Sequence, residues 1–240
     1  MGLRKTIGLI GGMSWESTIL YYKIINEVIS QKLGGLHSAK IILYSVDFAE
    51  VEQCQAEGRW EDAGNLLGSV AKRLQLAGAD FVVLCTNTMH KVAFRIEECI
   101  DIPLLHIADV TALELSNHNI YKVGLLGTKY TLQQDFYKEK LAEKGIEAII
   151  PCEADIEIVN RVIYDELCTG EIRSESKQEF LRIIESLHTA GAEGIVLGCT
   201  EIGLLIKQAD VSVPVFDTTI LHAKAAAKEL SASNVRSAKR

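Results

Sequence analysis

The feature of the sequence that most constrains its fold is an internal repeat. The segment LAGADFVVLCTNT begins at Leu76, and the similar segment TAGAEGIVLGCTE begins at Thr189. Two further matches keep the same order at almost the same offset: 7–11 (IGLIG) with 123–127 (VGLLG), and 102–105 (IPLL) with 213–216 (VPVF). Three matches in one order predict a chain built from two similar halves.

Each half alternates short β-branched runs with longer segments of helical spacing. The runs 81–84 (FVVL) and 195–197 (IVL) are apolar throughout, which is typical of parallel strands covered on both faces. Strands are expected at 6–10, 40–46, 80–85, 104–106, 122–126, 147–151, 194–197 and 213–216, and helices at 15–33, 59–77, 133–144, 154–169 and 177–190. The pattern predicts an α/β fold of two pseudo-symmetric halves, each a parallel sheet flanked by helices.

The repeat also suggests where one half ends and the next begins. The first half is expected to span residues 1–101 and the second residues 102–216. The C-terminal segment 217–240 follows the last expected strand, and we expect it to form a helix that rejoins the first half. Such a return would bring the two chain ends close together, as in many domains.

The composition narrows the class of protein. With 48% hydrophobic and 24% charged residues, the chain is globular, and its net charge of −7 argues against a nucleic-acid partner. No apolar run reaches the roughly 18–20 residues of a membrane span. The N-terminus shows no signal-peptide pattern, so a cytoplasmic location is expected. The six cysteines form no CxxC pair and the histidines no ligand spacing, so no metal is expected.

Polar residues follow the repeated strand in both halves. Ligands of parallel sheets bind beyond the carboxyl ends of strands, and there the sequence reads CTNTMH at 85–90 and GCTE at 198–201. When the two copies of the repeat are superposed, Thr86 aligns with Cys199. Cys85 lies one residue earlier, and a shift of one residue turns a strand side chain to the other face. We therefore expect Cys85 to be a buried core thiol.

Thr86 and Cys199 are expected to face a shared cleft from opposite sides. Such a pair can remove a proton from one face of a substrate carbon and deliver a proton to the other. A thiol suits the base, because its ordinary pKa of roughly 8.5 can be lowered at a helix N-terminus. Asn87, Thr88, Thr200 and nearby backbone N–H groups can hold a carboxylate and stabilise an enolate-like charge.

These residues carry a resemblance to a known family. The chain resembles the aspartate/glutamate racemases, cofactor-independent enzymes that use a pair of cysteines. The resemblance rests on 8–18 (GLIGGMSWEST), 87–90 (NTMH) and 198–201 (GCTE), and it extends over essentially the whole chain. Within the family, the chain is similar to enterobacterial racemases of broad or L-aspartate/glutamate specificity. The resemblance implies flavodoxin-like halves with the active site between them, a small amino-acid substrate, no cofactor and a homodimer.

The chain departs from the family at one catalytic position. In the two-cysteine members the residue before Asn-Thr-x-His is the first catalytic cysteine, whereas here it is Thr86. A neutral hydroxyl is a much weaker base than a thiolate, although it can donate a proton or a hydrogen bond. We therefore expect an asymmetric racemase that favours L-substrate, in which Cys199 abstracts the α-proton and Thr86 donates on the other face.

The resemblance assigns further positions to substrate binding. Met13 and Ser14 match backbone contacts of the family, Gln55 matches a substrate-contacting glutamine, and Glu201 follows in the GCTE motif. Family members often place a basic residue near 163–170 to hold a side-chain carboxylate. Here that segment is acidic (IYDELCTG), which leaves amino acids other than aspartate and glutamate open.

The same residues also allow other interpretations. One is another enzyme of the superfamily, of the hydantoin racemase, arylmalonate decarboxylase or maleate isomerase type. A second is a non-catalytic amino-acid-binding module. The segment 8–12 lacks the dinucleotide pattern GxGxxG, so no nucleotide is expected. His90 is expected to be either a structural histidine or a group that tunes the site, and Cys168 is expected to be structural.

Overall fold

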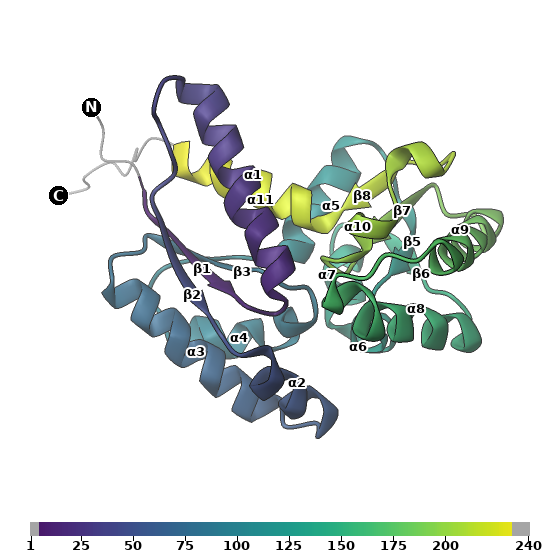
Figure 1. The fold of residues 1–240 in the computed structure, drawn as a ribbon, viewed down its shortest axis with the longest axis horizontal. Helices are drawn as coiled ribbons and strands as arrows, with labels where there is room; N and C mark the ends of the chain where they lie inside the picture. Colours follow the sequence, from purple (N-terminus) through teal and green to yellow (C-terminus); the bar gives the residue numbers. More distant parts are fainter. Residues whose placement is uncertain (1–4, 232–240) are drawn as a thin grey trace.

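The computed structural model describes residues 5–231 and contains two four-stranded parallel sheets (Figure 1). The first has the strand order β2-β1-β3-β4 and the second β6-β5-β7-β8, so the strands of the two halves correspond one to one. The strands are β1 (Ile7–Gly11), β2 (Ile41–Ser45), β3 (Phe81–Leu84), β4 (Leu104–Leu105), β5 (Lys122–Leu126), β6 (Glu147–Ile149), β7 (Gly194–Leu197) and β8 (Val215–Asp217). The order 2-1-3-4 is flavodoxin-like. The expected fold class, two pseudo-symmetric α/β halves, is confirmed.

Helices connect the strands and flank each sheet (Figure 1). They are α1 (Trp15–Leu33), α2 (Phe48–Ala56), α3 (Trp60–Leu76), α4 (Ala93–Glu98), α5 (Ile107–Asn117), α6 (Lys129–Gln133), α7 (Asp135–Ala142), α8 (Glu153–Asp165), α9 (Ser174–Thr189), α10 (Ile202–Leu205) and α11 (Thr218–Ser231), with short 3₁₀ turns η1 (Thr88–Val92), η2 (Leu167–Thr169) and η3 (Gln208–Asp210). The first helix of each half begins at a hydroxyl cap. Ser14 accepts the N–H of Ser17 at α1, and Thr128 accepts the N–H of Thr131 at α6.

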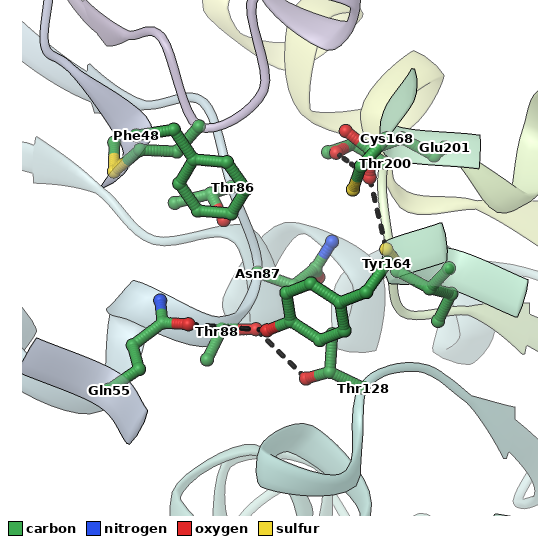
Figure 2. Close-up of a pocket in the computed structure, with 13 residues that line it drawn as sticks. Phe48, Gln55, Thr86, Asn87, Thr88, Thr128, Tyr164, Cys168, Thr200 and Glu201 are labelled. Carbon is green, nitrogen blue, oxygen red and sulfur yellow. Dashed lines mark hydrogen bonds between the residues drawn. The ribbon is translucent and has the colours of Figure 1, made fainter. Parts of the chain in front are cut away.

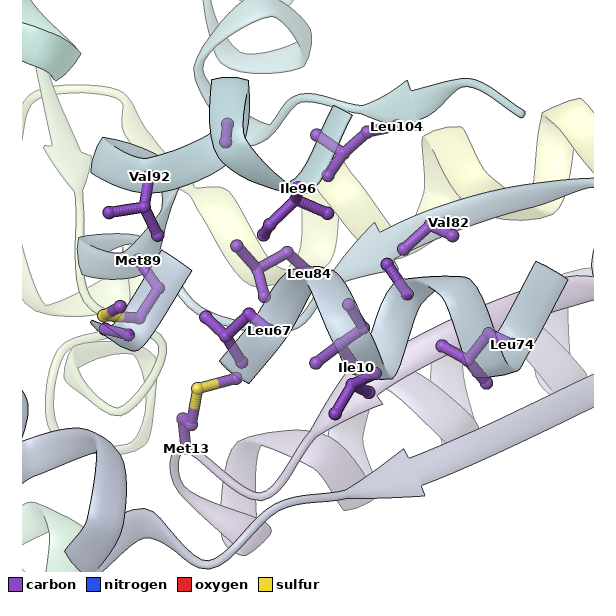
Figure 3. Close-up of a cluster of buried hydrophobic side chains, with 14 of the residues drawn as sticks. Ile10, Met13, Leu67, Leu74, Val82, Leu84, Met89, Val92, Ile96 and Leu104 are labelled. Atoms are coloured by element: carbon purple, nitrogen blue, oxygen red, sulfur yellow. The ribbon is translucent and has the colours of Figure 1, made fainter. Parts of the chain in front are cut away.

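Both faces of each sheet are covered, which explains the uniformly apolar strands. In β1, Ile10 packs in the cluster under α3 and α4 that contains Leu67 and Ile96 (Figure 3). Its neighbour Leu9 points to the opposite face and packs with Tyr21 of α1 and Ala226 of α11. Each fully buried side chain of this size contributes about 1.5–3 kcal/mol, so the two layers of packing fix the ends of the strands firmly.

The last helix of each half packs on the sheet of the other half. Helix α5 follows β4 of the first sheet, yet its Ile107 and Ala112 belong to the cluster around Val123 of β5. Helix α11 follows β8 of the second sheet, yet its Ala223 packs with Ile7 of β1. The two helices also contact each other. The chain therefore crosses between the halves twice, once at each of these helices.

Two predicted boundaries are wrong. Leu104 and Leu105 pair with Val82 and Val83 of β3, so the first half continues past the expected limit at residue 101. The reason is that IPLL at 102–105 is the repeat partner of the last strand of the second half. The helix expected over 133–144 breaks at Gln134, whose extended backbone separates α6 from α7.

The helix predicted over 15–33 is confirmed as α1, whereas two further helix limits differ from the prediction. The helix expected over 154–169 ends at Asp165 and is followed by η2. Of the helix expected over 217–240, α11 is described as far as Ser231, and positions 232–240 lie outside the described residues. Within residues 5–231, no helix is both long and apolar enough to cross a membrane.

Candidate active site

A small cavity lies between the halves, beyond the carboxyl ends of β3 and β7 (Figure 2). It is lined by Met13, Phe48, Gln55, Thr86, Asn87 and Thr88 from the first half, and by Thr128, Ile163, Tyr164, Cys168, Cys199, Thr200 and Glu201 from the second. Eight of the nine predicted site residues are therefore among its lining residues. The ninth, Ser14, donates a hydrogen bond to the lining residue Glu201. The cavity volume is about 20 Å³, close to the roughly 10–15 Å³ that one water needs, so the site is closed.

Cys199 donates a hydrogen bond to a fixed carboxylate. Its Sγ lies 3.0 Å from Oε2 of Glu201, and the Thr200 hydroxyl donates to the same oxygen at 2.7 Å. The hydroxyl of Ser14 reaches across from the first half and donates to Oε1 at 2.7 Å. Glu201 is only 3% exposed, so these three donors replace its hydration. The carboxylate is held in position to receive the proton of the thiol.

The protonation state of Cys199 follows from these surroundings. Burial raises the pKa of the thiol well above its ordinary value, and the neighbouring Glu201 carboxylate raises it further. The helix N-terminus that was expected to lower this pKa belongs to α10, which is a single turn of four residues. In the closed site Cys199 is therefore a neutral thiol that is hydrogen-bonded to the Glu201 carboxylate.

Thr86 is held in the cavity wall by His90. The ring Nδ1 donates to the backbone carbonyl of Thr86 at 2.8 Å, and the backbone N–H of Ile107 donates to Nε2 at 3.2 Å. Both ring nitrogens are thus engaged by backbone groups, and burial lowers the pKa of His90 well below its usual range. His90 is a neutral positioning residue that ties the loop after β3 to the start of α5.

Cys85 lies in the core and not among the lining residues of the cavity. It is fully buried in the cluster that contains Tyr21 and Ala223, and its thiol donates weakly to the carbonyl of Val83 at 3.9 Å. Burial raises its pKa. Its position agrees with the prediction that a shift of one residue turns this side chain away from the site.

Asn87, which lines the cavity, carries an acceptor without a partner. Its Nδ2 donates to the hydroxyl of Thr218 at 3.0 Å, and that hydroxyl itself donates to the carbonyl of Leu197 at 2.7 Å. Since the hydroxyl hydrogen is used, Thr218 must accept, which fixes the orientation of the amide. Oδ1 of Asn87 is buried without a hydrogen-bond partner. It is free to accept a hydrogen bond from a bound molecule.

Two further hydrogen bonds join the halves around the cavity (Figure 2). The hydroxyls of Thr88 and Thr128 lie 3.0 Å apart. The hydroxyl of Tyr164, on α8, donates to Oε1 of Gln55, on α2, at 3.2 Å. Nε2 of Gln55 donates in turn to Sδ of Met89 at 2.9 Å. The first and second halves are thus hydrogen-bonded across the site.

Five lining residues were not predicted from the sequence: Phe48, Thr128, Ile163, Tyr164 and Cys168. Three of them lie within 163–170, where Tyr164 and Cys168 supply an aromatic ring and a thiol in place of the basic residue that the resemblance implies. Thr128 could have been found as the counterpart of the Ser14 helix cap. The lining includes no Lys, Arg or His, and no group of three potential metal ligands occurs within residues 5–231.

The proteins that this chain resembles are racemases, and the chain is an enzyme of this class of isomerases. Residues 10–226 match the sequence model of the Asp/Glu/hydantoin racemase family, and the chain belongs to this family. It is 25% identical to the broad specificity amino-acid racemase RacX of Bacillus subtilis, over 91% of this chain and 95% of that protein.

Two solved structures show the same fold. A protein proposed to be an Asp/Glu racemase, from Yersinia pestis, is 56% identical with a TM-score of 0.89, over 95% of this chain and 100% of that one. An aspartate racemase homologue from Pyrococcus horikoshii is 39% identical with a TM-score of 0.82, over the same shares of the two chains.

Proposed function

We propose that the protein racemises a small α-amino acid of the aspartate/glutamate class without a cofactor, with Cys199 as the base and Thr86 as the group on the opposite face. The observation that carries the proposal is the hydrogen bond of 3.0 Å from Cys199 to Glu201, in a cavity that Thr86 lines from the other half. A carboxylate within hydrogen-bond distance can activate a thiol as a base.

The proton transfers balance over one turnover. The thiol of Cys199 passes its proton to Glu201, and the thiolate takes the α-proton of the L-substrate. The resulting carbanion takes the hydroxyl proton of Thr86, which yields the D-product. The proton held on Glu201 then returns to Thr86 through solvent after the site opens. A hydroxyl is a poor base, so kcat from saturating D-substrate is lower than kcat from L-substrate, while kcat/KM is equal in the two directions because the enantiomers have the same free energy.

A lining without Lys, Arg or His favours substrates beyond aspartate and glutamate. Oδ1 of Asn87 suits the α-ammonium group, and the Thr88 and Thr200 hydroxyls suit the carboxylate. Around Tyr164 and Gln55 the lining offers only uncharged hydrogen-bonding groups to a side chain. We therefore propose a broad specificity that includes amino acids with uncharged side chains.

The assembly and location implied by the family stay predictions. A homodimer is supported by an exposed apolar stripe on α1, where Trp15, Ile19 and Tyr22 are 61%, 54% and 53% exposed. We expect a cytoplasmic protein without nucleic-acid or membrane partners. Sedimentation of the purified protein at several concentrations tests the dimer.

The deciding experiment follows the α-proton by NMR in D₂O, with L-aspartate, L-glutamate and a panel of neutral L-amino acids, together with chiral analysis. Exchange with formation of D-product is expected. Exchange without inversion would remove Thr86 from the mechanism. Release of carbon dioxide from a malonate would indicate a decarboxylase instead, and binding without exchange would indicate a binding module.

A further inference from the structure

We propose that Tyr164 is the gate of the cavity, and that amino acids reach Cys199 through an outer groove on the far side of its ring. This inference rests on the proposed function, because it concerns how the substrate of that site gets in. The closed cavity of about 20 Å³ has room for little more than a water, whereas even the smallest chiral amino acid has six non-hydrogen atoms. Part of the wall must therefore move before substrate binds.

Only one lining residue is shared by the cavity and a much larger groove outside it. This groove has a volume of about 470 Å³ and lies between α2, α6 and α8. Its wall includes Glu52 from the first half and Lys129 and Arg161 from the second. Tyr164 lines both spaces, so its side chain is the partition between them.

A hydrogen bond between the halves holds this partition shut. The hydroxyl of Tyr164 donates to Oε1 of Gln55 at 3.2 Å, and the two side chains point toward one another (Figure 2). Gln55 is only 3% exposed and is anchored by its second hydrogen bond, to Met89. Since α8 and α2 belong to different halves, separation of the halves at this edge must break the bond.

The groove also suits the ligand chemically. Lys129 and Arg161 provide cations for an α-carboxylate, and Glu52 and Asp165 provide anions for an α-ammonium group. Both signs of charge lie within one groove, which favours a zwitterion over a simple anion. The inner cavity offers no cation, so the groove is the place where a free amino acid first meets complementary charge.

The gate is tested by the rate at which iodoacetamide alkylates Cys199, which requires no turnover. Cys199 is 8% exposed in the closed site, so alkylation reports opening. Tyr164→Phe keeps the ring and removes the hydrogen bond. We expect alkylation to become roughly threefold to tenfold faster, the factor that one lost hydrogen bond gives. Gln55→Leu should have a similar effect, and the double variant no more than either change alone.

Two controls separate gating from other effects. Tyr44→Phe removes a tyrosine hydroxyl that binds Arg73 on the surface, and it should leave the rate unchanged. A gate variant should raise the alkylation rate by the same factor at every pH, whereas a change in the pKa of Cys199 would displace the pH profile. Thermal unfolding checks that each variant is folded.

The proposal is overturned if Cys199 is alkylated at the wild-type rate in Tyr164→Phe. It is also overturned if the alkylation is accelerated instead by Phe48→Leu, a change at a residue that lines the cavity but not the groove. Protection of Cys199 by an added amino acid should persist in Tyr164→Phe. Accelerated alkylation in the gate variants, without α-proton exchange in the wild-type protein, would support the gate and contradict the proposed racemase function. The two proposals can therefore fail separately.

Discussion

In each half, the residue that caps the first helix reaches across to the loop after the third strand of the other half. Ser14, the cap of α1, donates to Glu201, and Thr128, the cap of α6, lies within hydrogen-bond distance of Thr88. Thr88 and Glu201 occupy the same position in the two copies of the repeat. The two contacts are therefore related by the pseudo-twofold symmetry of the molecule.

The chemistry at these equivalent places differs. In the second half the Glu201 carboxylate accepts a hydrogen bond from Cys199, whereas in the first half the Thr88 hydroxyl lies at the equivalent position near Thr86. A thiol hydrogen-bonded to a carboxylate therefore occurs on one side of the site only. The backbone supplies the two-sided geometry, and under the proposed mechanism the side chains at these equivalent positions decide the direction of proton transfer.

The largest effect should come from removing the base. Cys199→Ala should lower α-proton exchange from L-substrate by at least about 10³-fold, because it removes the thiol that is hydrogen-bonded to the Glu201 carboxylate, the feature that sets Cys199 apart from the other lining thiol, Cys168. Thr86→Ala should keep exchange and lose inversion. NMR exchange with chiral analysis measures both. Equal losses of exchange in the two variants would contradict the asymmetry between the halves.

Replacing the Glu201 carboxylate tests the difference between Glu201 and Thr88, its counterpart in the first half. Glu201→Gln should reduce kcat/KM by about 10²-fold, since the acceptor of the thiol proton is lost. The matched change Thr88→Val should cost less than about tenfold. The carboxylate raises the pKa of Cys199, so Glu201→Gln should also move the pH profile of alkylation to lower pH. Slower turnover together with an easier deprotonation would identify Glu201 as a proton acceptor.

We expect acid to destabilise the fold by protonating histidines that lie where α5 and α11 meet. Burial lowers the pKa of His106 to about 4 and of His222 to about 3, against roughly 6.5 in an unfolded chain. Below pH 6.5 the unfolded state binds protons that the folded state does not, so stability falls as the pH falls. Each histidine should cost about 2 kcal/mol of unfolding free energy between pH 7 and 5, by the linkage of proton binding to folding.

Urea unfolding of His222→Gln measures this contribution. Glutamine can accept from the Tyr21 hydroxyl and donate to the Leu105 carbonyl, the two partners of His222. The loss of stability between pH 7 and 5 should shrink by the contribution of one histidine, because glutamine does not titrate.

The smallest effect should come from restoring the symmetry. Thr86→Cys places a thiol at the position equivalent to Cys199, without a neighbouring carboxylate. We expect the ratio of kcat from L- and D-substrate, each measured at saturation, to move toward one by about tenfold, because a thiol is a better base than a hydroxyl. An unchanged ratio would show that the carboxylate, and not the thiol alone, decides the direction.

The repeat predicted the features that follow from local pattern, and missed those that depend on contacts between the halves. The repeat aligned Thr86 with Cys199. The two-residue period of a strand then predicted that the side chain of Cys85 lies in the core. It could not predict the bond from Tyr164 to Gln55, since these residues are 109 positions apart and α2 was not among the expected helices. The break between α6 and α7 at Gln134 was also missed, because no Gly or Pro occurs there in the sequence.

The exchange of α5 and α11 between the sheets makes the two copies of the repeat mutually dependent. A fragment that ends after β4 would lack the alanine face of α11 and would leave Ile7 and Leu9 facing water. A fragment that begins at β5 would lack α5 and uncover Val123. What looks in the sequence like a tandem pair of modules is therefore one cooperative folding unit, which should melt in a single transition.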